Sequence, residues 1–179
     1  MRRGFDCGAG LTGSAGLLAK PARVGKADPV TAFQIRDAVA GDMSVLRDVF
    51  RRSSLSNDGD RAKLLSHPEV LELSDLAVTK GRTRAAVIDG VIAGFATWLP
   101  AGDALELEDL FVDPDWMLHG AGRALVLDVA GIARDRGVRK LEVTANQHAR
   151  AFYTKVGFIV DGYVQTTFGP ALRMHLDLT

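Results

Sequence analysis

The chain has 179 residues, of which 47% are hydrophobic and 25% are charged. A chain of this length and apolar content fits a single domain with a substantial core. Twenty-two basic residues balance twenty-two acidic ones, so the excess of positive charge typical of proteins that bind nucleic acid or membrane surfaces is absent. We therefore expect small molecules or peptides as partners, with no nucleic acid and no membrane.

The first 31 residues are rich in glycine and alanine and follow neither the helical nor the strand period. We expect residues 1–31 to form a flexible extension and residues 32–179 to form one domain. Glycines interrupt the apolar run after Arg2 and Arg3 and no typical cleavage site follows, so we do not expect a secretory signal. No stretch approaches the roughly 18 apolar residues of a transmembrane helix. The one cysteine, Cys7, excludes an internal disulfide framework and favours a cytoplasmic location.

The first part of the domain predicts one strand followed by two helices. Residues 33–36 alternate like a short strand. Asp42 can cap a helix whose apolar side chains recur at the helical period: Met43, Leu46, Val49 and Phe50. A second helix follows Asn57, where the segment SNDGD supplies capping residues, and the pair His67-Pro68 ends it.

Three antiparallel strands come next. The pair Asp89-Gly90 suits a type I′ turn and lies between strand-like runs at 84–88 and 91–99. The following strand, 105–112, contains a phase break, because its apolar residues occupy odd positions before Asp109 and even positions after it. A β-bulge near Asp109 explains the switch, since one extra residue reverses the facing of every later side chain. Phe111 is also apolar, so a strand buried on both faces past Glu108 is the alternative.

A glycine-containing loop joins this strand to a long helix, whose apolar face includes Leu125 and Val129 at the helical period. Asp113-Pro114 ends the strand, Gly120-Ala121-Gly122 opens the helix, and Gly137 supplies its C-terminal stop. Backbone N–H groups at a helix start have no intrahelical partners, so the glycines and the helix dipole suit this loop to a pyrophosphate. An ordinary tight turn is the alternative, because glycine simply permits positive φ.

The C-terminal part predicts a strand at 139–144, a short helix before Gly157 and a last pair of strands. One face of that helix carries Ala149, Phe152, Tyr153 and Val156. The whole order is β, α, α, three antiparallel strands, α, β, α, β, β. This order predicts a mixed α/β (α+β) fold, with a mostly antiparallel sheet and helices on both of its faces.

The chain carries two motifs in this order, EDLFVDP…GAGRAL and N-x-x-A-x-x-F-Y-x-x-x-G-F, within residues 105–158. The resemblance of these motifs is to the GNAT superfamily of acetyl-CoA-dependent N-acetyltransferases. It implies the GNAT-like acyl-CoA N-acyltransferase fold, acetyl-CoA as cosubstrate, and a bulge that splays the strand 105–112 from the next strand of the sheet. The implied reaction is direct attack by a bound primary amine of a small molecule or peptide in a ternary complex. The alternative is a CoA-binding sensor of the same fold with weak or no turnover.

The resemblance assigns the cofactor to two stretches of backbone. The acetyl and pantetheine groups would meet Leu110, Phe111 and Val112. The pyrophosphate would meet Leu118, His119, Gly120, Ala121, Gly122 and Arg123. The family usually has Gln or Arg where this chain has Met117, so a charge-assisted hydrogen bond to phosphate is lost unless His119 or Arg123 compensates. Asn146 matches the asparagine that hydrogen-bonds the cofactor arm, and it also suits the N-cap of its helix.

The resemblance also implies the catalytic residues. Tyr153 matches the tyrosine beside the cofactor sulfur, where a phenol can protonate a departing thiolate, although a core aromatic is the alternative. We favour Glu108 as the general base, because a strand end beside a bulge aims its side chain into a cleft. Asp109, Glu142 and water are rivals, and in another interpretation Glu106 and Glu108 only line a solvated face. No cluster of His, Cys, Asp or Glu shows metal-ligand spacing, so we expect no metal.

The fold implied by the resemblance places the acceptor site between the segments 51–68 and 164–171. Charges in and near these segments are mixed. Asp58, Asp60 and Glu69 suit an ammonium group, whereas Arg51, Arg52 and Arg61 suit a carboxylate or a phosphate. The identity of the acceptor therefore stays open, as does the choice between a monomer and a homodimer.

Overall fold

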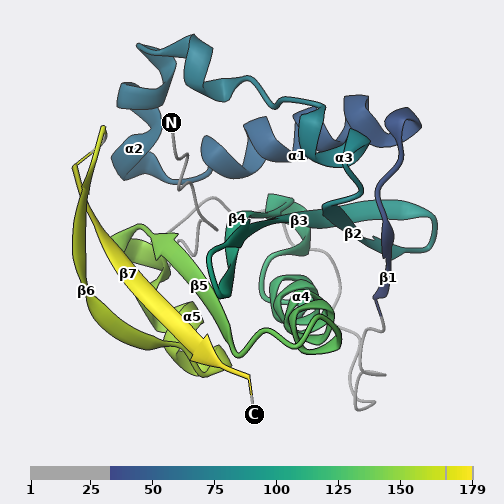
Figure 1. Ribbon diagram of the computed structural model, residues 1–179. Helices are drawn as coiled ribbons and strands as arrows, with labels where there is room; N and C mark the ends of the chain where they lie inside the picture. Colours follow the sequence, from purple (N-terminus) through teal and green to yellow (C-terminus); the bar gives the residue numbers. More distant parts are fainter. Residues whose placement is uncertain (1–32, 168, 179) are drawn as a thin grey trace, which may run out of the picture.

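The computed structural model describes residues 33–167 and 169–178, which form one seven-stranded sheet with helices on both faces (Figure 1). The sheet order is β1-β2-β3-β4-β5-β7-β6, and neighbours are antiparallel except for β4 and β5. The strands are β1 (Gln34–Asp37), β2 (Thr83–Ile88), β3 (Val91–Ala101), β4 (Ala104–Val112), β5 (Lys140–Ala145), β6 (Ile159–Thr166) and β7 (Gly169–Asp177). The predicted mixed, mostly antiparallel fold is thus confirmed. The expectations for residues 1–31, Cys7 included, lie outside the described residues.

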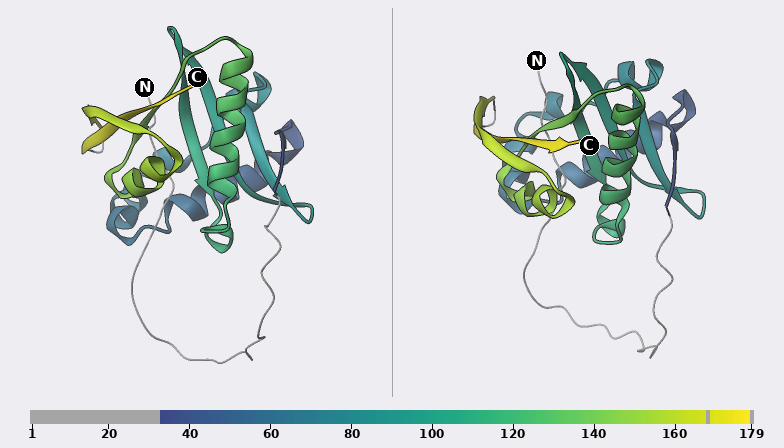
Figure 2. Two further views of the ribbon diagram at one scale, coloured as in Figure 1. Left: turned by 90° about the horizontal axis from the view of Figure 1, so that it is seen from below. Right: turned by 60° about the horizontal axis from the view of Figure 1, so that its bottom comes forward.

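Two groups of helices cover the two faces of the sheet. On the upper face in Figure 1 lie α1 (Met43–Ser54), α2 (Asp58–Leu65) and α3 (Leu76–Thr79), and on the lower face lie α4 (Ala121–Asp135) and α5 (Arg150–Val156). Figure 2 shows α4 running along the strands of its face. Four 3-10 turns occur at Ala40–Asp42, Pro68–Leu71, Pro114–Trp116 and Gln147–Ala149. Within the described ranges, no helix is long and apolar enough to cross a membrane.

Each group of helices packs on its own core. The larger core lies under α4 and α5 and includes Leu107, Leu125, Val129, Leu141 and Tyr153. The smaller core lies under α1 and includes Leu46, Val49, Phe50, Phe95 and Phe111. Burying one such side chain stabilises the fold by about 1.5–3 kcal/mol. The predicted apolar faces of α1 and α4 therefore determine which side of each helix meets the sheet.

Local turn and capping signals are largely confirmed. Asp89 and Gly90 have φ values of 49° and 77°, the left-handed pair that a type I′ hairpin turn requires. The side chain of Asn57 accepts the N–H of Gly59 at 2.9 Å and so caps α2. The helix α3 was not predicted, because four residues are too few to show a helical period.

Asp42 acts differently from the expectation that it caps α1. Its carboxylate makes no cap hydrogen bond to that helix. It accepts the N–H of Val39 at 2.8 Å and pairs with Arg36 at 2.7 Å. Asp42 therefore closes the 3-10 turn that precedes α1 and ties this turn to β1, because its side chain reaches back along the chain.

Candidate active site

The predicted bulge in β4 is present, and its extra residue is Glu108. Thr97 of β3 pairs with Asp109 whereas Trp98 pairs with Leu107, so Glu108 has no partner position on β3. The bulge moves Leu110 onto the same core as Leu107, as the phase break in the sequence predicted.

The alternative interpretation of the phase break is confirmed as well. Phe111 lies in the core under α1, where its ring centroid is 4.7 Å from that of Phe50. β4 is therefore both bulged and buried on its two faces.

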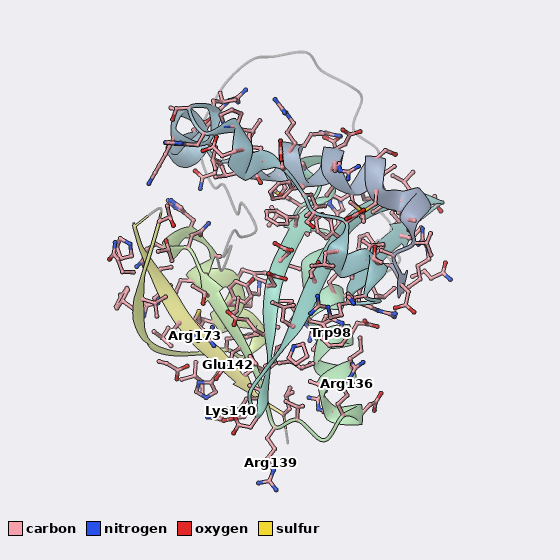
Figure 3. All side chains as sticks on the ribbon, turned by 45° about the horizontal axis from the view of Figure 1, so that its top comes forward. Trp98, Arg136, Arg139, Lys140, Glu142 and Arg173 are labelled. Carbon is pink, nitrogen blue, oxygen red and sulfur yellow. The ribbon has the colours of Figure 1, made fainter. Side chains whose placement is uncertain are left out.

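β4 and β5 separate just past the bulge. Their parallel pairing covers three positions and ends at Leu107 opposite Val143. Beyond it, β5 continues along β7 and β4 continues along β3. Figure 3 shows the two parts of the sheet diverging from this point. The side of β4 at residues 108–112 that faces away from β3 is thus not paired with β5. Leu110, Phe111 and Val112, the residues predicted to meet the cofactor, lie in this stretch and are buried.

The glycine loop lies at the end of the same strand. Leu118 and Gly120 have positive φ values of 66° and 94°, and α4 begins at Ala121. Leu118, His119, Gly120 and Arg123 are exposed, and His119 Nδ1 lies 2.8 Å from the carbonyl of Met117. The loop thus exposes residues on both sides of the start of a fifteen-residue helix, although Ala121 and Gly122 themselves are buried. A helix N-terminus suits an anion.

Gly122 joins the loop to the two neighbouring elements. A side-chain carbon on Gly122 would lie 3.3 Å from the ring of Phe152 in α5 and 3.5 Å from a methyl group of Val112 in β4. The predicted strand and loop residues are therefore brought together, and α5 packs against both. Phe152 lies on the apolar face predicted for its helix, but its contact with Gly122 was not predicted, because a contact between separate helices leaves no local pattern in the sequence.

Met117 and Arg52 complete the surroundings of the loop. Met117 packs against the core under α4. Arg52 of α1 pairs with Asp113 at 2.9 Å and with Asp115 at 2.8 Å. Hydrogen bonding to Asp115 raises the pKa of Arg52, and the charge of Asp113 adds to the shift. Arg52, one of the cations considered for the acceptor, is thus held by the carboxylates of the loop.

Asn146 and Tyr153 occupy the other side of the opening. The side chain of Asn146 accepts the N–H of Ala149 at 3.0 Å, which confirms its capping role. Tyr153 is 1% exposed and packs edge-on against Phe152 and Phe158. Its core cluster also includes Val112 of β4 and Ala145 of β5. The structure thus places Tyr153 in the core, among side chains from both diverging strands.

A partly buried ion-pair network lies where β4 and β5 still pair. Arg173 of β7 binds Glu106 at 2.9 Å and also pairs with Glu142. Thr144 contributes its hydroxyl, 3.0 Å from Arg173. Glu106 is only 7% exposed, so the interpretation that it lines a solvated face is wrong. Figure 3 shows Arg173 and Glu142 side by side. The network was missed because Arg173 is 67 residues from Glu106 in the chain.

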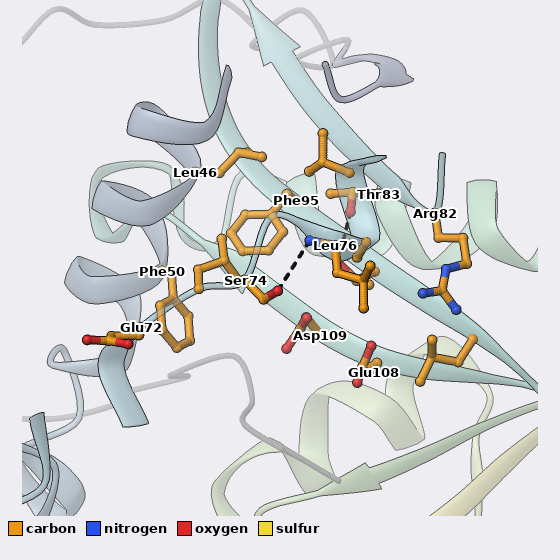
Figure 4. A pocket seen from close by; sticks show the side chains of 15 residues that line it. Leu46, Phe50, Glu72, Ser74, Leu76, Arg82, Thr83, Phe95, Glu108 and Asp109 are labelled. Carbon is orange, nitrogen blue, oxygen red and sulfur yellow. Dashed lines mark hydrogen bonds between the residues drawn. The ribbon is translucent and has the colours of Figure 1, made fainter. Parts of the chain in front are cut away.

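A cavity of about 350 Å³ lies on the other side of the bulge, beneath α1 and α3 (Figure 4). Glu108 and Asp109 line it from β4, and Arg82 and Thr83 line it from the start of β2. Its apolar walls include Leu46, Phe50, Leu73, Leu76, Phe95 and Leu99. None of the lining residues belongs to segments 51–68 or 164–171, where we expected the acceptor. The segment 72–78 was missed, since it carries no periodic pattern.

The described residues contain no group of three His, Cys, Asp or Glu side chains placed to hold a metal ion. Three acidic residues line the cavity: Glu108 and Asp109 at the bulge, and Glu72. The site combines the start of a helix, a stretch of β4 that does not pair with β5, and a carboxylate-lined cavity around one bulge. These parts suit a bound anion on one side of β4 and a cationic group on the other.

Comparison with known proteins relates this architecture to acetyltransferases. Over 52 residues the chain is 36% identical to a glucosamine 6-phosphate N-acetyltransferase of Trypanosoma brucei brucei. This match covers 29% of this chain and 35% of the relative. Over 68 residues it is 34% identical to a thialysine N-epsilon-acetyltransferase of Caenorhabditis elegans. This second match covers 36% of this chain and 41% of the relative. The chain therefore spans less than half the length of these curated relatives.

A solved structure extends the similarity to most of the fold. The PaiA N-acetyltransferase of Thermoplasma acidophilum, in complex with coenzyme A, superposes with a TM-score of 0.66 at 18% identity. The match covers 82% of this chain and 99% of that one. Residues 49–158, more than half of the chain, match the family described as Acetyltransferase (GNAT) family. The chain therefore belongs to the GNAT family of acetyltransferases.

Proposed function

We propose that the protein is an N-acetyltransferase that transfers the acetyl group of acetyl-CoA to a primary amine. The observation that carries the proposal is the opening between β4 and β5, with the glycine loop at one end and Glu108 at its apex. The relatives named above are N-acetyltransferases of small amines, which supports an acceptor of the same kind. In this proposal the two substrates bind together and the amine attacks the thioester directly.

The cofactor would bind along the backbone of β4 and the start of α4. Leu110, Phe111 and Val112 would offer backbone groups to the acetyl and pantetheine parts, and residues 118–123 would hold the pyrophosphate. The exposed Gly120 and Arg123 at the start of α4 and the left-handed conformation of Gly120 support this placement, because the N–H groups at a helix start favour a bound anion. Asn146 would act from the opposite strand while it caps the turn before α5.

Glu108 and Tyr153 would handle the protons. Glu108 would accept a proton from the acceptor amine, so that the nitrogen lone pair can form the new N–C bond as the C–S bond breaks. Tyr153 would return a proton to the departing thiolate. The position of Glu108 in the bulge and in the wall of the cavity supports the first role. Asp109 lines the same cavity and is the rival base, whereas the ion pair of Glu142 with Arg173 makes Glu142 a weaker candidate.

A CoA-binding sensor with weak or no turnover is the second candidate. The side chain of Met117 favours it, because Met117 packs against the core where the family usually places a residue that binds phosphate. In that case acetyl-CoA would bind without being consumed.

The test measures thiol release from acetyl-CoA with a panel of primary amines. Wild-type protein should release thiol in an amine-dependent way, and Glu108→Gln should lower the rate near neutral pH by roughly 10². It should also flatten the acid limb of the pH profile of kcat/KM. Asp103→Asn, in the exposed turn between β3 and β4, is the control and should keep full activity. Binding of acetyl-CoA without release for any amine would favour the sensor.

A further inference from the structure

The cavity beneath α1 and α3 contains a cation whose side chain has no counter-charge. Arg82, the residue before β2, lines this cavity, and its Nε atom is buried without a hydrogen-bond partner. Among the described residues, no ion pair involves Arg82. A buried guanidinium nitrogen without a partner is unfavourable, because it has lost water and gained nothing in exchange. The arginine therefore lacks the anion that its fork-like geometry suits.

The backbone holds Arg82 at this place in the fold. Its N–H donates to the carbonyl of Ala77 at 2.9 Å, and its carbonyl accepts the N–H of Trp98 at 3.0 Å. The first bond ties it to α3 and the second to β3. The backbone of Arg82 is thus fixed by α3 and β3, so the position of this residue does not depend on a ligand.

The opposite charge lies on the other wall of the same cavity. Figure 4 shows the guanidinium of Arg82 and the carboxylates of Glu108 and Asp109 around one hollow. Between them the wall is apolar, with Leu76, Phe95 and Leu99 among its residues. A volume of about 350 Å³ is at the small end of the range for pockets that hold small molecules. The hollow is therefore built for a compact molecule with a cationic and an anionic end.

We propose that the acceptor is a small amino acid-like molecule whose carboxylate binds Arg82 while its amine lies at Glu108 and Asp109. The inference rests on the proposed acetyltransferase function and names the class of its acceptor. Arginine and carboxylate can form two parallel hydrogen bonds, which fix the orientation of the acceptor as well as its charge. Arg82 thus acts as a specificity-determining residue: it places the amine at the bulge, beside Glu108 and Asp109.

The experiment compares acceptors that differ in the carboxylate alone. Leucine and a series of ω-amino acids of increasing length are assayed with acetyl-CoA beside the corresponding carboxamides. For the amino acid whose length fits the cavity, wild-type protein should prefer the carboxylate over the carboxamide. The expected ratio of kcat/KM is about 10², mainly through KM. Arg82→Gln should abolish this preference by raising KM for the carboxylates far more than for the carboxamides. Arg82→Lys should restore part of it, because the charge returns without the fork.

The control is Arg134→Gln, which removes an exposed arginine from α4 on the opposite face of the sheet and should keep the preference. Equal loss for acids and amides in Arg82→Gln would show a structural role and overturn the inference, as would a wild-type protein without any preference. Calorimetry of the same amino acids with CoA-loaded protein separates the two proposals. Carboxylate binding that depends on Arg82 without thiol release would refute catalysis and support the site, whereas amine-dependent release with no such binding would refute the site alone.

Discussion

Removing Arg173 should destabilise the fold more than removing any single charge on the surface. The guanidinium of Arg173 is 20% exposed and neutralises two carboxylates, Glu106 at 9% and Glu142 at 27% side-chain exposure. These two glutamates are register partners on β4 and β5. Arg173→Met would leave two facing negative charges without a cation at the base of the opening.

The magnitude follows from the burial of the three groups. Breaking a buried ion pair by removing one partner costs about 3–5 kcal/mol. Glu142 is partly exposed and can turn towards water, so we expect a loss of about 3 kcal/mol for Arg173→Met. This corresponds to a fall in Tm of roughly 6–12 °C for a domain of this size. Glu106→Gln should cost only about 1 kcal/mol, because the amide oxygen can still accept from Arg173 and the Glu142 pair remains.

Urea unfolding of the two single variants and the double variant measures these effects. Glu106→Gln should destabilise the wild-type protein but stabilise Arg173→Met, because in that background it removes one of two facing charges. Arg134→Met, at an exposed position of α4, is the matched control and should change the free energy of unfolding by less than about 0.5 kcal/mol. An effect of Arg173→Met no larger than this control would refute the network, as would the same sign of Glu106→Gln in both backgrounds.

Three further predictions concern cofactor binding, the proposed proton donor Tyr153 and the pH dependence of stability. Acetyl-CoA at a hundredfold excess over its Kd should stabilise the protein by about 2.7 kcal/mol in melting curves, and Gly120→Ala should weaken this effect because φ is 94° at that residue; an unchanged melting curve with acetyl-CoA and CoA would contradict the cofactor site. Tyr153→Phe should lower turnover by roughly 10² without changing acetyl-CoA affinity, since it removes the proton donor and keeps the ring; full activity would return Tyr153 to a purely structural role. Hydrogen bonding by Arg36 lowers the pKa of Asp42, so this pair stabilises the fold above the unfolded-state pKa of about 4 and loses that contribution as the pH falls through the folded-state pKa. Arg36→Met should flatten the acid-side decline in urea stability, and an unaltered decline would exclude the pair as its source.

The sequence alone determined the features that depend on neighbours in the chain. The periods of Leu46 and Phe50 in α1, and of Leu125 and Val129 in α4, predicted which faces are buried, because a helix repeats its facing every 3.6 residues. The pair Asp89-Gly90 predicted its turn for the same local reason. The phase break in 105–112 even located the bulge to within one residue, since a single insertion changes the parity of every later side chain.

The tertiary structure decided which charged groups meet. Glu106 and Glu108 are two residues apart in one strand, yet Glu106 is buried against Arg173 and Glu108 lines the cavity with Arg82. Arg173 comes from β7 and Arg82 from the start of β2, and their places follow from the order of strands in the sheet. No local period encodes that order, because strand pairing is settled by the packing of the whole sheet between its two layers of helices. The role of each carboxylate was therefore set by partners far away in the chain.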